Sequence, residues 1–433
     1  MKPRSLWICL LSLAGLSLAT CPTEIHATVP HHDFDEGHHN PRRAKPLSEI
    51  HSTLETCPNI TTLDLRFAYI GCAESPERWS LPFSPSGSTR FPSAIESLSL
   101  AGYSFGESEA AYIKGPPRRW IDWETTLSGI QWWVRSGNAW RWLKWQVLPE
   151  AQKSKTNIEL WLGAMDFSQV RNLSITESGF ELRKRPLEFL ANTLAPHLPS
   201  LRSLAVEGPE LRDFVYAIPA ESLSALSWVS PGTAHAEVQT FLERHGKQLT
   251  ALEWRTPESL ERVRPVIPTA ILQTLKSLTP RLEHLTLDLN RNSTTWPWEE
   301  LKALAQGSPD TLTNVTVYLE MASECQRQKM AIGWEAWNGM DPEACTGTQE
   351  FAQPLLNSTT AREVASFLLH SGIKSLEQVN LSAGDWKPPY DRGLYYPNWL
   401  DHRRSWIRCD VRNSGGEIIC DGKDTDTEQR YHY

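Results

Sequence analysis

Apolar residues recur along this chain in a short pattern, leucine-x-x-leucine-x-leucine, with isoleucine, valine or tryptophan at some positions. The pattern occurs nine times, at residues 60–65, 95–100, 170–175, 201–206, 223–228, 249–254, 282–287, 312–317 and 376–381. The second half of each copy alternates apolar and polar residues, as in a strand with one buried face. The sequence therefore predicts nine short strands.

Segments with apolar residues at helical spacing lie between these strands. They cover residues 186–198, 236–249, 269–278, 298–307 and 361–372. Proline stands shortly before several strands, as Pro199 does before residues 201–206. Because proline favours the end of a helix, this placement predicts that strand, turn and helix alternate in an α/β fold built from repeats.

The spacing of the repeats carries a family resemblance. Central apolar positions 173, 204, 226, 252, 285 and 315 are separated by 31, 22, 26, 33 and 30 residues. This pattern resembles the leucine-rich-repeat family in an irregular form, with repeats of about 22–35 residues. The resemblance implies a horseshoe-like solenoid over residues 50–390. The chain departs from the family pattern because the asparagine or cysteine that usually follows the strand is mostly missing.

Two gaps interrupt the series, from position 98 to 173 and from 315 to 379. Each is long enough for an insertion or for an unrecognised repeat, and we place insertions at about residues 103–160 and 320–358. The pattern stops beyond residue 385. Residues 391–433 are therefore predicted to form a C-terminal cap that contains a disulfide, because a solenoid needs a cap to close its core.

The N-terminus predicts secretion. Residues 1–19 place Lys2 and Arg4 before an apolar run, with Ser17 and Ala19 at the −3 and −1 positions of a signal peptidase site. No other stretch has the roughly 20 apolar residues of a membrane-spanning helix, so we expect an extracellular protein without stable membrane insertion. Six acceptor sequons for N-glycosylation agree with this location: Asn59, Asn172, Asn292, Asn314, Asn357 and Asn380.

In its signal peptide, irregular repeats and many tryptophans, the chain is similar to a group of uncharacterised secreted proteins of filamentous fungi. Those proteins are like F-box leucine-rich-repeat proteins that lack the F-box. This resemblance implies a fold and no particular activity.

The cysteines predict disulfides that pin local loops. Six of the seven that follow the signal peptide form couples close in sequence: Cys57 with Cys72, Cys325 with Cys345, and Cys409 with Cys420. Cys21 is left over in residues 20–45, a polar tail that ends near the dibasic Arg42-Arg43. Cleavage after Arg43 would make this tail a propeptide and remove Cys21.

The same tail contains four histidines, His31, His32, His38 and His39. Paired imidazoles can ligate copper or zinc. No regular ligand spacing follows, so a solvated tail without a metal is the favoured interpretation.

Composition narrows the classes of function. The net charge is −8 and the sequence contains no long run of basic residues. Both features argue against nucleic acid as a partner. Motifs for a nucleophile elbow, a zinc protease or a phosphate-binding loop are absent, so we expect no cofactor and no metal. A pair of carboxylates for glycoside hydrolysis stays open, because their separation in space cannot be read from a sequence.

Side chains that alternate with the core leucines should line the concave face of such a solenoid. The charged ones form the candidate recognition patch: Asp64, Arg66, Glu253, Arg255, His284 and Asp288. A solvated face without a partner is the alternative. Three sequons, at Asn172, Asn314 and Asn380, fall on the same face, where attached glycans would obstruct a protein partner.

Residues 120–145 hold seven tryptophans. Their helical spacing predicts two amphipathic helices whose apolar stripes pack on the core, among them Val134, Leu143 and Val147. Trp132 and Trp145 fall outside these stripes and are candidate binding residues, with core packing as the alternative.

Two hypotheses about function follow. The first is a secreted, non-catalytic recognition or scaffold protein that binds a protein or a cell-wall glycan through its repeat surface. The second is a secreted carbohydrate-active hydrolase that uses an unrecognised pair of carboxylates.

Overall fold

The structure is a computed structural model. It describes residues 21–29, 47–67, 90–92, 94–103, 105, 131, 134, 143, 146–147, 155–176, 188–232, 235–258, 263–291, 295–325, 351–385, 404–412 and 417–425. In these residues the chain has an α/β fold with one open sheet of 12 strands, in which the order of the strands follows the chain.

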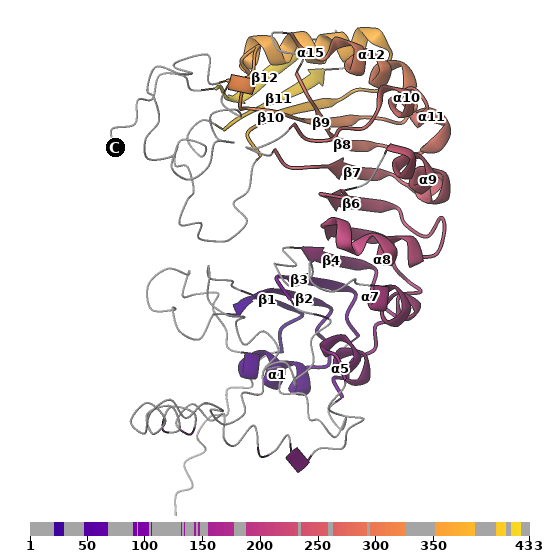
Figure 1. Ribbon diagram of the computed structural model, residues 1–433, viewed down its shortest axis with the longest axis vertical. Helices are drawn as coiled ribbons and strands as arrows, with labels where there is room; N and C mark the ends of the chain where they lie inside the picture. The colour runs from indigo at the N-terminus through magenta and orange to yellow at the C-terminus, as the bar shows by residue number, and fades with distance from the viewer. Residues whose placement is uncertain are drawn as a thin grey trace, which may run out of the picture.

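The strands stack from β1 at one end of the molecule to β12 at the other (Figure 1). Their bounds are β1 Glu24–Val29, β2 Thr62–Phe67, β3 Ser97–Ala101, β4 Asn172–Thr176, β5 Ser203–Glu207, β6 Ala225–Val229, β7 Ala251–Arg255, β8 His284–Leu289, β9 Asn314–Leu319, β10 Gln378–Ala383, β11 Ser405–Arg412 and β12 Glu417–Lys423. Strands β1 to β10 pair in parallel, and β11 and β12 continue the sheet in antiparallel pairing. All nine predicted strands are confirmed.

Helices run beside the strands, and the labels α7 to α12 follow the right-hand side of the stack in Figure 1. Their bounds are α1 Leu47–Thr56, α5 Asn157–Ala164, α7 Glu188–Thr193, α8 Arg212–Ala217, α9 His235–His245, α10 Thr269–Leu272, α11 Leu275–Leu278, α12 Trp298–Gly307 and α15 Ser358–Ser371. Each predicted helical segment overlaps at least one of them. Among these described helices, none combines the length and the apolar character that crossing a membrane requires.

One continuous hydrophobic core lies between the helices and one face of the sheet, called here the core face. In β2 and β3, Leu63 pairs with Leu98 and Leu65 with Leu100, and all four are buried. The same cluster includes Leu242 of α9 and other apolar helix residues. Because strand side chains alternate, the residues between these leucines lie on the opposite side, called here the open face.

The two gaps in the repeat series add no strand to the sheet between the repeats that they separate. Strand β3 pairs directly with β4, and β9 pairs directly with β10. An unrecognised repeat would have placed another strand between the members of each pair, so that alternative is wrong.

The N-terminal segment corrects two predictions. Residues Glu24–Val29 were expected within a polar tail, but they form β1, which is parallel to β2 and buries Ile25, Ala27 and Val29. Cys57 pairs with Cys21 and not with Cys72. Strand pairing brings Cys21 beside the end of α1, which sequence distance concealed. Cleavage after Arg43 would therefore leave residues 20–43 attached through this disulfide.

One of the other two predicted couples, Cys409 with Cys420, is described at both cysteines. Cys409 of β11 and Cys420 of β12 face each other in register and form a disulfide, as predicted. Cys325 is also disulfide-bonded. Cys72, Cys345, the signal peptide and the four tail histidines lie outside the described residues.

Candidate functional site

The open face carries a long row of mostly polar side chains, one from each of the strands β1 to β11. In register order the row is His26, Asp64, Ser99, Ser174, Ala205, Ser227, Glu253, Thr286, Thr316, Asn380 and Arg408. With strands spaced by about 4.8 Å, this row is roughly 50 Å long. Most of these side chains are half-buried or exposed, so the open face is a polar surface on a rigid sheet.

The predicted recognition patch does not form one site. Asp64 and Arg66 lie on β2, whereas Glu253 and Arg255 lie on β7, five strands away in the sheet. Five strand spacings amount to roughly 24 Å. The two groups could contact one ligand only if that ligand spanned much of the open face.

A second charged group accompanies Asp64 at the N-terminal end of the sheet. The imidazole of His26 lies between two carboxylates, with Nδ1 3.2 Å from Oδ2 of Asp64 and Nε2 3.2 Å from Oε2 of Glu24. Hydrogen bonds that the imidazole donates to Asp64, the larger contribution, and to Glu24 raise the pKa of His26 above its usual value. All three side chains are about half exposed.

Arg255 and Asp288 belong to a densely paired group at the carboxyl ends of β7 to β10, called here the rim cluster. Its members are Glu253, Arg255, Glu258, Arg264, Asp288 and Asp385. Nη1 of Arg264 lies 3.1 Å from Oδ1 of Asp288 and 3.2 Å from Oδ1 of Asp385. Nη1 of Arg255 lies 2.8 Å from the other oxygen of Asp385.

The arginines of the rim cluster have further partners. Arg264 donates through Nη2 to the carbonyl oxygen of Tyr318 at 2.7 Å and through Nε to Oδ1 of Asn290 at 3.2 Å. The guanidinium of Arg255 lies 4.3 Å from the centre of the Tyr318 ring. A buried guanidinium requires partners of this kind, because an unpaired buried charge is costly.

Two carboxylates of the rim cluster also accept hydrogen bonds from the backbone. Glu258 accepts hydrogen bonds from the backbone N–H groups of Met321 and Ala322 at 3.0 and 2.8 Å. Asp288 accepts one from the N–H of Thr256. Burial raises the pKa of Glu258 and of Asp288 to about 7 in each case, and the positive charge of Arg264 opposes the increase.

This geometry changes the role expected for Asp288. Its side chain is 1% exposed and is committed to Arg264, so the prediction that it contacts a ligand is wrong. The side chain of Arg255 is also largely covered. A pattern of strand positions gives the face of a residue, but it cannot show that a loop and residue 385 cover this part of the open face.

The rim cluster does not have the form of a hydrolytic site. Asp288 and Asp385 are close to each other, but both are buried and bind the same arginine. A cavity of about 20 Å³ adjoins Asp288, Arg255 and Thr256. That volume suits about one water molecule and is too small for a sugar ring.

The hairpin of β11 and β12 presents a different surface, which the sequence analysis did not select. Trp406, Arg408 and Asp410 alternate along β11 with the buried Ile407, Cys409 and Val411. The open-face residues here are Trp406, Arg408, Asp410, Arg412, Glu417, Ile419, Asp421 and Lys423. Apolar Ile407, Cys409 and Val411 alternate with polar residues in the sequence, and this alternation could have predicted strand β11.

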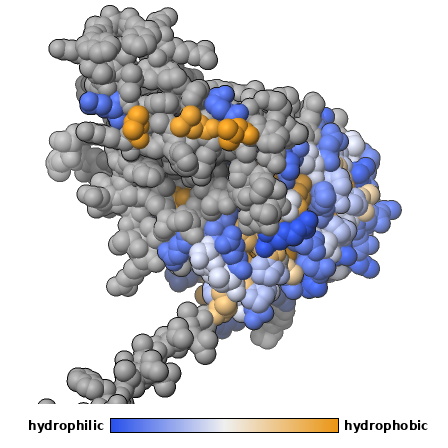
Figure 2. Space-filling view, turned by 90° about the horizontal axis from the view of Figure 1, so that it is seen from below, coloured by the Kyte–Doolittle hydropathy of each residue, from blue (hydrophilic) through white to orange (hydrophobic). Residues whose placement is uncertain are grey.

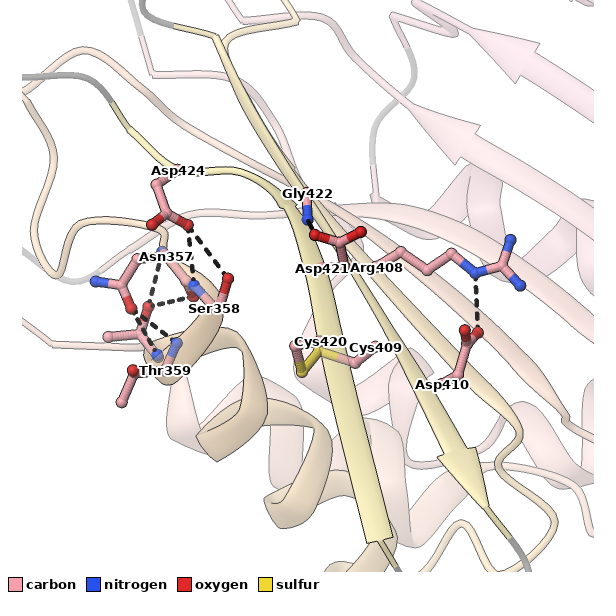
Figure 3. The surroundings of a disulfide bond; sticks show 11 residues. Asn357, Ser358, Thr359, Arg408, Cys409, Asp410, Cys420, Asp421, Gly422 and Asp424 are labelled. Carbon is pink, nitrogen blue, oxygen red and sulfur yellow. Dashed lines mark hydrogen bonds and ion pairs between the residues drawn. A yellow bond between two sulfur atoms is a disulfide. The ribbon is translucent and has the colours of Figure 1, made fainter.

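Figure 3 shows how the hairpin is held. The Cys409–Cys420 disulfide joins the two strands beside helix α15, and Arg408 and Asp410 extend on the other side. Nε of Arg408 donates to Oδ1 of Asp410 at 2.8 Å. Both of these side chains are more than half exposed.

The sequons differ in their surroundings. Asn59 and Asn172 are exposed, whereas Asn357 caps helix α15 through its side-chain oxygen. Asn314 contacts His284, with Nδ2 2.7 Å from Nδ1 of the imidazole. Asn380 accepts from Gln378 and donates to Thr316. Asn292 lies outside the described residues.

The tryptophan-rich stretch is described at only a few positions. Residues 134, 143 and 147 are helical, as predicted, but Val134, Leu143 and Val147 are 55%, 51% and 82% exposed. The prediction that these three side chains pack on the core is therefore wrong. Figure 2 shows a described surface that is mainly hydrophilic, with a few hydrophobic residues exposed on this side. Trp132 and Trp145 lie outside the described residues.

In the part of the chain that the structure describes, no group of three or more histidine, cysteine, aspartate or glutamate side chains is arranged to hold a metal ion.

Comparison with models of protein families finds no family that matches this chain, and comparison with curated proteins finds no significant relative.

Proposed function

We propose that this protein is a secreted, non-catalytic recognition protein, built as an irregular leucine-rich-repeat solenoid, that binds an extracellular protein or glycan through the open face of its sheet. The observation that carries the proposal is the row of polar side chains across the open face, from His26 to Arg408. Repeat proteins commonly use an extended surface of this kind for binding.

The burial and pairing of the carboxylates support a binding function more than a hydrolytic one. The close carboxylates at Asp288 and Asp385 are buried and neutralised by arginines. A glycosidase needs two carboxyl groups that flank the scissile bond and reach it. In the described residues, the exposed carboxylates of Glu24 and Asp64 both bind His26, and that of Asp410 is paired with Arg408.

A binding screen against fungal and plant cell-wall polysaccharides, with reducing-sugar release measured in the same samples, tests the proposal. We expect binding without release. Open-face substitutions such as Arg66→Ala or Arg408→Ala should weaken it, whereas Glu363→Gln on the exposed side of α15 should not. Sustained release of reducing ends would instead identify a hydrolase, and sensitivity confined to helix-side variants would move the binding surface.

Secretion has its own test. Disulfides persist in oxidising compartments, so the Cys21–Cys57 and Cys409–Cys420 bonds support an extracellular location. Mass spectrometry of secreted protein should find a mature N-terminus at Thr20. If a protease cuts after Arg43, the N-terminal peptide should separate only after reduction, because Cys21 remains bonded to Cys57.

A further inference from the structure

Trp406 is unusual among the described tryptophans because it is exposed. It is 55% exposed, whereas Trp161, Trp228, Trp254 and Trp296 are buried in the core. The core face of β11 is already occupied by Ile407, Cys409 and Val411. Packing of the hairpin therefore does not require an indole at position 406, and a large aromatic ring left in water points to a ligand.

The neighbours of Trp406 leave room above its ring. In register it pairs with Ser382 of β10 on one side and Lys423 of β12 on the other. Ser382 has a small side chain, so this side of the indole is not crowded by a bulky neighbour on the adjacent strand. A flat ring could lie against the indole from the open face.

Polar side chains surround this aromatic position at short range. Arg408 is two residues along the strand, roughly 7 Å away, and it is paired with Asp410. Asn380 lies directly opposite Arg408 and is oriented by Gln378 at 2.8 Å and by Thr316 at 3.2 Å. A guanidinium paired with a carboxylate, and an amide held by two other side chains, offer fixed donors and acceptors to hydroxyl groups.

The charges on this surface are balanced. The hairpin carries three positive charges on this face and three negative ones, namely Arg408, Arg412 and Lys423 against Asp410, Glu417 and Asp421. A site for an anionic polymer would carry an excess of basic residues. The balance favours a neutral ligand that combines a flat apolar side with hydroxyl groups.

We infer that the open face of the hairpin is a binding site for a neutral glycan, with Trp406 stacked on a pyranose ring and Arg408, Asp410 and Asn380 bound to its hydroxyl groups. This inference rests on the proposed recognition function and assigns its ligand class. It also requires that Asn380 carries no attached glycan, since both ends of its amide already have partners within the site.

Calorimetric titration of the full-length secreted protein tests this assignment. The probes are soluble β-linked oligosaccharides of glucose, of xylose and of N-acetylglucosamine, with oligogalacturonate as the anionic comparison. The wild type should bind at least one neutral series more tightly than oligogalacturonate. Trp406→Ala should weaken binding at least about tenfold, Trp406→Tyr should weaken it less, and Val263→Ala, which trims an exposed side chain elsewhere, should have no effect.

The possible results separate this inference from the broader proposal. Binding of a glycan or protein that Trp406→Ala leaves unchanged would overturn the glycan site at the hairpin and keep recognition by the open face. Preference for oligogalacturonate would overturn the neutral class, and so would the absence of any glycan binding. Full glycan occupancy at Asn380, measured by peptide mapping, would also overturn the site. Thermal unfolding of each variant checks that the fold is intact.

Discussion

The rim cluster and the hairpin place the same residue types in opposite situations. Arg264 with Asp288 and Arg408 with Asp410 are both arginine–aspartate pairs beside one sheet, although Arg264 itself lies in the loop after β7. The Arg264 side chain is 1% exposed, whereas that of Arg408 is 56% exposed. The first pair is enclosed by the loop after β7 and by Asp385 after β10, so it holds chain segments together. The second pair remains available to a ligand.

This contrast indicates that charge on the open face is a poor guide to binding unless burial is known. In the rim cluster, Arg255 and Arg264 join β7, β8 and the residue after β10, which are far apart in the chain. Their interactions with one another replace those with water. Binding residues must keep part of their polar surface exposed, as Arg408 and Asp410 do.

Replacing the central arginine gives the largest expected effect. Arg264→Met should lower the free energy of unfolding by about 3–5 kcal/mol, because Asp288 would remain buried without its cation and Asp385 would keep only Arg255. Arg408→Met is the matched control and should cost less than about 1 kcal/mol. Urea denaturation of both variants measures the difference. Equal losses would contradict the distinction between the two pairs.

Removing the hairpin disulfide should give the next largest effect. Cys409→Ala with Cys420→Ala opens a short covalent loop, and the expected loss is about 2–3 kcal/mol from the greater entropy of the unfolded chain. Hydrogen exchange should increase in β11 and β12 and stay unchanged in β7 and β8. A uniform increase along the sheet would instead mean that the hairpin unfolds together with the rim cluster.

Burial of Asp288, in contrast to exposed Asp410, should make the free energy of unfolding depend on pH. Burial raises the pKa of Asp288 to about 7, above the value of about 4 for an unfolded chain. The folded protein therefore retains a proton that the unfolded chain releases, so the free energy of unfolding decreases as pH rises from about 4 to about 7. Asp288→Asn should reduce this slope by at most about 1.4 kcal/mol per pH unit.

Asp410→Asn is the control for that measurement, because Asp410 is exposed on the same face. Calorimetric unfolding between pH 4 and pH 8 measures the slope in both variants. An unchanged slope in Asp288→Asn would show that Asp288 does not take up a proton on folding in this range.

The exposed pair should give the smallest effect. A double-mutant cycle with Arg408→Met and Asp410→Asn should give a coupling energy of about 0.2–1 kcal/mol, because water screens both charges. Increasing salt should reduce the coupling. Coupling that exceeds about 2 kcal/mol and resists salt would place the pair in a buried environment like that of Arg264.

The repeating part of the fold could be predicted because its signal is local. The alternation in residues 284–289, for example, places Leu285 and Leu287 on the core face without reference to any distant segment. The same reasoning failed for β1, where histidine and glutamate neighbours concealed the alternation of Ile25, Ala27 and Val29. It also failed for Val134, Leu143 and Val147, because helical spacing predicts an apolar stripe but not the presence of a core opposite it.

The candidate site was less predictable for the same physical reason. Asp288 and Asp410 have similar local surroundings in the sequence, each in a strand with apolar neighbours. Only the approach of Arg264 and Asp385 distinguishes the first, and no spacing rule predicts that Arg264 meets Asp385, 121 residues further along the chain.

The sequence by itself determined the strand and helix order and the faces of nine strands, because the alternation of side chains is a property of each strand. Tertiary structure decided which side chains on the open face remain exposed, which cysteine bonds to Cys57, and that β11 and β12 present an exposed Trp406. These features depend on segments meeting in space. A buried polar side chain links chain segments, whereas an exposed one can bind a ligand. Which of the two applies to a given residue depends on the assembled sheet.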